Sequence, residues 1–169
     1  TFTVFEKNIA MEAKKIIAYV HETNVERRDN MWLTVGRNLF SDNVSIINDG
    51  KFSGDGSVFY SINNSKTPHE DYYGYLWKQE KEIGNIVFRT GPMEENGSWF
   101  QSLSVEYIDD SGKWATASDL EIFPTFDTTN LALNKAHFTN YRLQFAPVKS
   151  TGIRIIGDAG GGSHWEKNS

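Results

Sequence analysis

The sequence contains no cysteine, and this absence excludes several kinds of protein. A disulfide-stapled scaffold, a zinc site built on thiolates and a cysteine nucleophile all require a residue that the chain lacks. Basic residues are in the minority, since 17 Lys and Arg stand against 22 Asp and Glu, for a net charge of -5. Binding to a phosphate backbone needs a basic surface, so nucleic acid is not an expected partner. No apolar run approaches the roughly 20 residues of a membrane-spanning helix.

Familiar catalytic patterns are missing as well. The four histidines stand far apart, and none belongs to the His-Glu-x-x-His pattern of a zinc protease. No serine lies in a Gly-x-Ser-x-Gly elbow. Adjacent carboxylates at 94–95 and 109–110 lie in turn-like contexts, where solvated side chains are expected. We therefore predict that the chain is not an enzyme, with a glycosidase or lyase as the least favoured alternative, because two facing carboxylates would suffice for it.

What the chain does have is many aromatic residues, 14% of the total, in short alternating segments. In one segment the alternation separates two sets of residues. One parity has Trp99, Leu103, Val105 and Tyr107, and the other has Ser102, Ser104 and Glu106. That alternation is typical of a strand with one buried face. Four segments have the length of strands and are bounded by turn-forming residues: 83–89, 100–108, 141–145 and 152–156.

Turn signals between these segments favour an antiparallel arrangement. Asp109-Asp110-Ser111-Gly112 predicts a hairpin turn that leads into a strand at Trp114. The segment 11–20 is compatible with a helix but at least as well with a strand. The expected fold is all-β, an antiparallel β-sandwich or jelly roll, with residues 1–169 forming a single domain.

The stretch 59–77 mixes aromatic rings with amides, an imidazole and carboxylates. Proteins recognise sugars with such mixtures, because a ring covers the apolar face of the sugar and the polar groups bind its hydroxyls. Tyr73, Tyr75 and Trp77 share one parity and fit the buried face of a strand better than a binding surface. The better candidates for a binding site in this stretch are Asn63, Asn64, His69 and Tyr72.

Several segments between about residues 40 and 160 have a characteristic order and spacing. They are 47–50 with Ser57-x-Phe59, then 86–91, 96–100, 103–107, 113–114, 141–148 and 152–157, followed by 160–161. In this order and spacing they resemble discoidin-like domains, which are also called coagulation factor 5/8 type C domains. The combination of a Trp-Phe pair before a Val-Glu-Tyr strand with a late Gly-Gly resembles family 32 carbohydrate-binding modules.

The resemblance implies an eight-stranded antiparallel jelly roll whose loops at one end bind a ligand, often galactose or a related sugar. It also implies a structural calcium ion in the Asp-Gly loop. Asp49 would supply a carboxylate, Ser57 a hydroxyl, and Ile47 and Lys51 their backbone carbonyls, all of them hard ligands of the kind that calcium prefers. The alternative for Asp49 is an Asx-turn without a metal ion.

The same resemblance implies a sugar site. Galactose-binding members use a histidine, an arginine followed by Asn-Gly, and an aromatic residue in the last loop. This chain matches the amide but has no arginine at the family's spacing before it, so the galactose-type set is incomplete. Arg89 fits a surface strand residue equally well. The positions that correspond to the family's site are Tyr60, His69, Arg89, Asn96, His164 and Trp165.

These features lead to one predicted function. We expect a non-catalytic carbohydrate-binding module that is tethered to an extracellular or cell-surface glycan-degrading enzyme. A domain of the same fold that adheres to proteins is the alternative, with apolar loop residues such as Phe52 and Met93 as its contacts. The closing strand of the family is not found after Trp165, so we expect the chain to be a piece of a larger protein.

Overall fold

A computed structural model describes residues 8–28, 31–38, 71–90, 100–126 and 139–158. Almost all the regular structure in these residues is β-strand, and every pairing is antiparallel, as predicted. In the part of the chain that the structure describes, no helix is long and apolar enough to cross a membrane. The elements are η1 (Ala10–Glu12), β1 (Lys15–Arg28), β2 (Met31–Asn38), β3 (Asp71–Arg89), β4 (Ser104–Ile108), β5 (Trp114–Thr116), β6 (Glu121–Phe123) and β7 (Asn140–Gly157).

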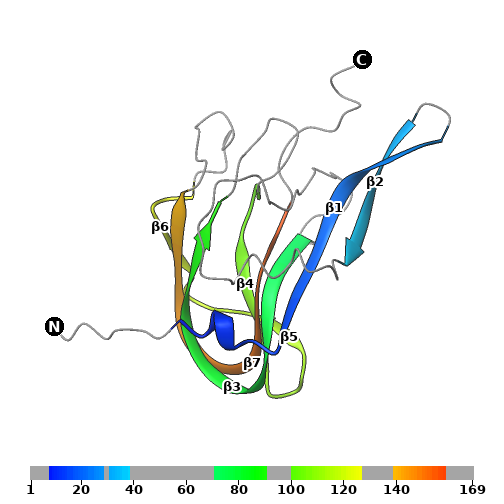
Figure 1. Ribbon diagram of the computed structural model, residues 1–169. Coiled ribbons are helices and arrows are strands. Elements are labelled where there is room, and N and C mark those ends of the chain that lie inside the picture. Colours follow the sequence, from blue (N-terminus) through cyan, green and yellow to red (C-terminus); the bar gives the residue numbers. More distant parts are fainter. Residues whose placement is uncertain (1–7, 29–30, 39–70, 91–99, 127–138, 159–169) are drawn as a thin grey trace.

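One continuous sheet forms both layers of the sandwich. Its strand order is β2-β1-β3-β7-β4-β5, and β6 pairs with β7 outside this path. The two longest strands, β3 and β7, run side by side and bend together into a U (Figure 1). One arm of the U pairs the start of β3 with the end of β7 and carries β1 and β4. The other arm pairs the end of β3 with the start of β7 and carries β6.

The bend joins segments that the sequence predicts as separate strands. Segments 141–145 and 152–156 both lie within β7, which continues through Pro147. The register between β3 and β7 shifts on either side of the bend, between Leu76 and Lys81 and between Ile83 and Asn85. Proline cannot donate a ladder hydrogen bond, so its place beside such irregular pairing is the one that a strand tolerates. Antiparallel pairing on both sides of the bend therefore keeps β7 a single strand.

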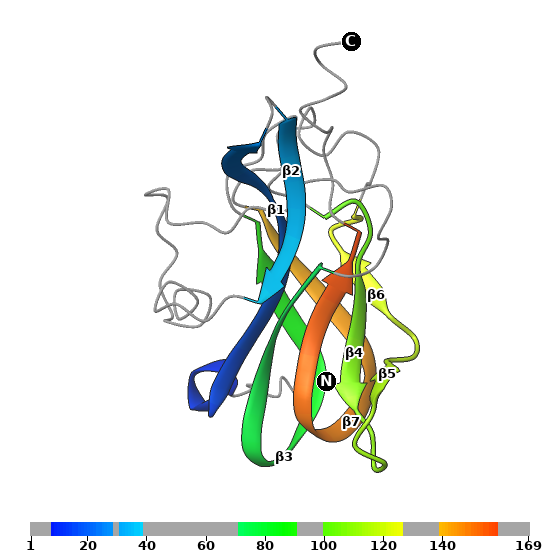
Figure 2. The same ribbon diagram turned by 90° about the vertical axis from the view of Figure 1, so that its right-hand side faces the viewer.

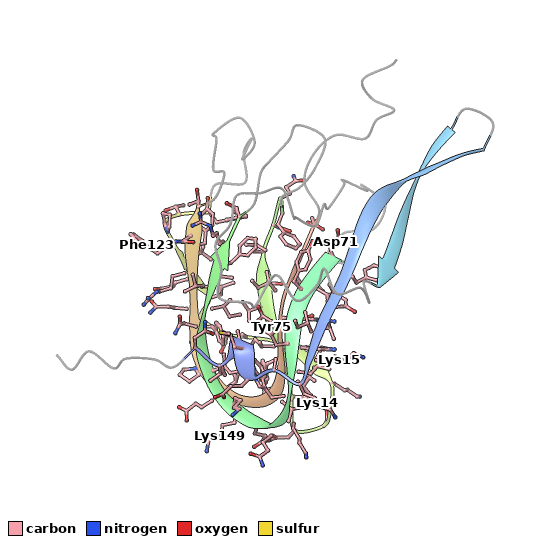
Figure 3. All side chains as sticks on the ribbon, in the orientation of Figure 1. Lys14, Lys15, Asp71, Tyr75, Phe123 and Lys149 are labelled. Atoms are coloured by element: carbon pink, nitrogen blue, oxygen red, sulfur yellow. The ribbon has the colours of Figure 1, made fainter. Side chains whose placement is uncertain are left out.

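The core fills the space between the two arms. Val105, Ile153 and Ile155 point inward from one arm, and Leu143 and Tyr141 point inward from the other. Leu143 and Val105 are completely buried. The predicted alternation is thus confirmed for the strand at 141–145 and for the strand that contains Val105. Trp77 is also buried, and Tyr75 packs against the same cluster and lies between the arms (Figure 3), as the parity of 73–77 predicted.

The first described residues form a short turn and then a strand. Ile9 and Ala13, on either side of η1, pack against the core, and Trp77 Nε1 donates a hydrogen bond to the Ile9 carbonyl at 2.9 Å. Segment 11–20, which the sequence left open between helix and strand, forms a strand from Lys15 onward. β1 pairs with β3 only from Lys15 to Tyr19, and its continuation pairs with β2 as a hairpin (Figure 2).

The turn predicted at 109–112 is present. The backbone N–H of Asp109 donates to the Lys113 carbonyl at 2.8 Å, and Gly112 has a φ of 80°. A positive φ favours glycine, which has no Cβ to collide with the backbone. The turn connects β4 to β5, whose first residue, Trp114, pairs with Ile108.

Candidate functional site

Two of the predicted site residues, Tyr72 and Arg89, lie within the described residues, both on strand β3. The other predicted sugar-binding residues lie outside them: Tyr60, Asn63, Asn64, His69, Asn96, His164 and Trp165. All four predicted calcium ligands, Ile47, Asp49, Lys51 and Ser57, lie outside them too. Within the described ranges, no group of three or more His, Asp or Glu side chains is arranged to hold a metal ion. The loop site and the calcium site therefore stay predictions.

Tyr72 lies on the outer face of the arm that contains β1, and its ring contacts two other side chains of that face. It stacks against Tyr19 of β1, with ring centroids 5.9 Å apart and planes 23° apart. The guanidinium carbon of Arg154 on β7 lies 4.6 Å from the centre of the Tyr72 ring. Tyr72 is half-buried as a result. Its ring is thus a member of a row of side chains that crosses the strands.

Arg154 continues this row toward the other edge of the sheet. Its guanidinium carbon also lies 4.2 Å from the centre of the Trp114 ring on β5. Its Nε and Nη2 donate to the same oxygen of Glu106 on β4, at 2.9 and 2.6 Å. The Arg154 charge is therefore balanced by a carboxylate, and both rings favour a cation above them. The row stabilises the outer face of this arm. Its cation, Arg154, is already paired with Glu106.

Arg89 lies on the outer face of the other arm, near the end of β3. Its Nη1 donates to Oδ1 of Asn140, its partner on β7, at 3.3 Å. The neighbouring outward position on β3 is Val87, which is 55% exposed although it is apolar. Arg89 thus lies on the outer surface of the strand, on a face that includes the exposed Val87. Its role in ligand binding stays a prediction.

This outer face has an exposed aromatic ring at its edge. Phe123 on β6 is 78% exposed, and it points away from the sandwich (Figure 3). Its partner on β7 is Arg142, and the partner of Arg142 on β3 is Val87. The three residues therefore form a row across three neighbouring strands. We call the surface around this row the Phe123 face; it consists of Val87, Arg89, Phe123, Asn140, Arg142 and Gln144.

The chemistry of the Phe123 face suits a polar ligand that also has an apolar side. Phe123 offers a ring that an apolar C–H surface can cover, and Val87 extends the apolar contact across the row. Asn140 and Gln144 are exposed amides that both donate and accept hydrogen bonds, while Arg142 offers several donors in a planar fork. Glu121 is paired with Gln144 and supplies a carboxylate at the border.

Sequence reasoning identified Arg89 but missed Phe123, Arg142 and Gln144. The signal for two of these was available, because the alternation that buries Tyr141 and Leu143 must expose the residues between and after them. Phe123 carried no such signal, since β6 has three residues and its pairing with β7 spans a long stretch of chain. A strand that short is below the length at which alternation becomes recognisable.

Comparisons with known proteins support the fold. No protein-family model matches the sequence, and no curated protein matches it either. A solved structure from BgaA, a β-galactosidase of Streptococcus pneumoniae, is similar to this chain with a TM-score of 0.51 and 16% sequence identity. The match covers 69% of this chain and 75% of that chain. At this level of identity the similarity shows a shared β-sandwich fold, and the resemblance to discoidin-like domains stays a prediction.

Proposed function

We propose that this chain is a non-catalytic carbohydrate-binding module of the discoidin-like type, tethered to a glycan-degrading enzyme outside the cell or on its surface. Its role would be to hold the parent enzyme on a polysaccharide. A single module needs little affinity for that purpose, since a dissociation constant of about 1 mM becomes effective when several modules act together.

The observation that carries the proposal is the Phe123 face. Phe123 is 78% exposed, and contact between its apolar ring and water is unfavourable. The ring is in register with the guanidinium residue Arg142 and lies on the same face as two planar amides. Sugars match this combination, because a pyranose has one apolar C–H surface and a rim of hydroxyls. The structural similarity to a chain from a β-galactosidase supports the same class of function.

The proposal keeps the loop site as a second surface. The resemblance to family 32 modules assigns it to Tyr60, His69, Asn96, His164 and Trp165, together with Arg89 on β3, with calcium bound near Asp49. A metal ion that binds only the folded chain must stabilise it. We therefore expect calcium to raise the melting temperature and EDTA to reverse the rise. Identical melting curves with calcium and with EDTA would remove calcium from the proposal.

Affinity electrophoresis against a panel of polysaccharides tests the proposed function. We expect at least one polysaccharide to retard the chain. Phe123→Ala should weaken that retardation, whereas Met11→Ala should not, because Met11 is an exposed apolar residue, 62% accessible, that lies in η1 and outside the Phe123 face. If Phe123→Ala binds normally and a His69→Ala, Trp165→Ala double variant does not, the loop site carries the binding. If no polysaccharide and no glycan on an array is bound at millimolar concentration, the proposed function is wrong.

A protein-adhesion domain is the second candidate, and the exposure of both Phe123 and Val87 favours it, because apolar patches are common in protein interfaces. Enzymatic deglycosylation of the bound partner separates the two functions. A carbohydrate-binding module loses its target after that treatment, whereas an adhesion domain keeps it.

A further inference from the structure

We infer that the Phe123 face selects glycans that carry carboxylate groups, with Arg142 as the residue that binds the carboxylate. The inference rests on the proposed function and names its ligand class. Three features carry it, namely the position of Arg142, the absence of a partner for its charge among the described residues, and the balance of charge on the face.

The position of Arg142 places a cation in the middle of the apolar row. β7 lies between β3 and β6 in this arm, and Arg142 is the register partner of Val87 on one side and of Phe123 on the other. Neighbouring strands are about 4.8 Å apart, so the row spans roughly 10 Å, enough for about two pyranose rings. A sugar ring that stacks on Phe123 therefore has its ring substituents within reach of the strand that carries Arg142.

The charge of Arg142 is not balanced by another side chain of the described structure. Arg142 is exposed and makes no hydrogen bond or ion pair with any described residue. The second arginine of β7 differs in this respect, because Arg154 is bound to Glu106 and lies over two rings. Arg89 differs as well, since it donates to Asn140. Arg142 is thus the arginine of β3 and β7 whose planar fork of donors has no partner among the described residues.

The local balance of charge on the face is opposite to that of the whole chain. The chain has a net charge of -5, yet Arg89 and Arg142 lie on the Phe123 face, with Glu121 at its border. Two arginines on one face of an acidic chain favour the approach of an acidic ligand to that face. A single guanidinium with a flat fork matches one carboxylate, through two parallel hydrogen bonds. A nucleic acid would instead need a broad basic surface.

Affinity electrophoresis with matched acidic and neutral polysaccharides tests this inference. The acidic probes are polygalacturonate, alginate and hyaluronan, and the neutral probe is galactan. We expect an acidic probe to bind more tightly than galactan. Its affinity should fall in about 0.5 M NaCl, because salt screens an exposed ion pair. Arg142→Gln should weaken binding of that probe by about tenfold. Arg142→Lys should restore part of it, because a lysine keeps the charge but not the fork.

The matched control is Lys149→Gln, which removes one positive charge from the same strand. Lys149 is exposed and is the register partner of Glu82 near the bend, at the other end of the arm from Phe123 (Figure 3). Binding of the acidic probe should be the same in this variant as in the unmodified chain. All three variants change exposed residues, so each should keep the melting temperature of the unmodified chain. If a variant melts earlier, the salt dependence of binding by the unmodified chain is used as the test instead.

The outcomes separate this inference from the proposed function. If galactan binds as tightly as every acidic probe and Arg142→Gln changes nothing, the selection for carboxylates is wrong and the proposed function stands. If Lys149→Gln weakens binding as much as Arg142→Gln, the attraction is nonspecific and the role of Arg142 is wrong. If neither kind of polysaccharide binds, the inference fails, and the wider polysaccharide panel and the glycan array decide on the proposed function.

Discussion

Arg154 donates two hydrogen bonds to one carboxylate oxygen of Glu106, at 2.9 Å from Nε and at 2.6 Å from Nη2. The two residues are register partners on β7 and β4, and their side chains are only 15% and 18% exposed. A pair that is this well covered is screened less by water and salt than a surface pair. Removing one partner leaves the other charge covered and unbalanced, which costs more than the pair contributes.

We therefore expect Arg154→Ala to lower the free energy of unfolding by about 2 kcal/mol, as measured by urea denaturation. Lys81→Ala is the matched control, because the Lys81–Glu12 pair is more exposed, at 32% and 37%. It should cost less than about 1 kcal/mol. A double-mutant cycle with Glu106→Gln should give a clear coupling energy. Equal effects of Arg154→Ala and Lys81→Ala would show that the covered pair has no special weight.

Gly157 should not tolerate a side chain. A Cβ at this position would collide with the carbonyl oxygen of Ser102, and it would lie 2.8 Å from the carbonyl carbon. Both atoms belong to the backbone and cannot rotate away, so we expect Gly157→Ala to cost about 3 kcal/mol in thermal or urea unfolding.

Gly84 provides the control for that substitution. A Cβ there would lie 3.4 Å from Cγ of Pro147, which is close to ordinary contact. Gly84→Ala should change stability by less than about 1 kcal/mol, since alanine also reduces the freedom of the unfolded chain. The interpretation of the close approach at Gly157 is wrong if both variants unfold at the same urea concentration.

Tyr75 should make the chain less stable in alkaline solution. Burial raises the pKa of its phenol from 10.0 to about 12, because the phenolate loses its hydration. The folded state then holds the proton more tightly than the unfolded state. The contribution is complete below pH 10 and is lost as the pH rises through 12, which amounts to at most about 3 kcal/mol. Tyr75→Phe should flatten this decline in unfolding experiments between pH 9 and about 12. An unchanged slope would contradict the prediction.

Asp109 should stabilise the turn between β4 and β5 only while it is ionised. Its Oδ1 accepts hydrogen bonds from the Ser111 hydroxyl at 2.6 Å, from the Ser111 N–H at 2.9 Å and from the Lys113 N–H at 3.0 Å. The side-chain bond from Ser111, followed by the backbone bond from Lys113, lowers the pKa of Asp109 below its usual 3.8. Its contribution is therefore present above that pH and lost as the pH falls through the lowered pKa.

The measurement for Asp109 is a comparison of melting temperatures at neutral and at strongly acidic pH. Asp109→Ala should melt below the unmodified chain at neutral pH, and the difference should shrink in acid. Asp110→Ala removes the same charge from the adjacent exposed position and should have a smaller effect. A difference between Asp109→Ala and the unmodified chain that persists unchanged in acid would show that ionisation is not the cause.

How much of the candidate site was predictable depends on the distance along the chain between its parts. The alternation around Leu143 predicts that Arg142 and Gln144 point outward, because neighbours in a strand face opposite sides. Segment 83–89 gives no such prediction for Arg89, because the apolar residues Ile83 and Val87 share its parity and the register shifts between Ile83 and Asn85. The register that brings Val87, Arg142 and Phe123 into one row links three strands, and no local pattern encodes such long-range pairing.

The sequence by itself determined the class of this protein and its local features. It specified an all-β antiparallel fold, the buried side of the strand at 141–145 and the turn at 109–112, because these depend on alternation and on turn chemistry within a few residues. Tertiary structure alone decided that β3 and β7 bend together into one continuous sheet and that Arg154 is paired with Glu106, whereas Arg142 has no partner among the described residues. It also decided that the exposed Phe123 is the register partner of Arg142. The physical reason is that partners and exposure are properties of the assembled sheet, in which each strand's neighbours come from distant parts of the chain.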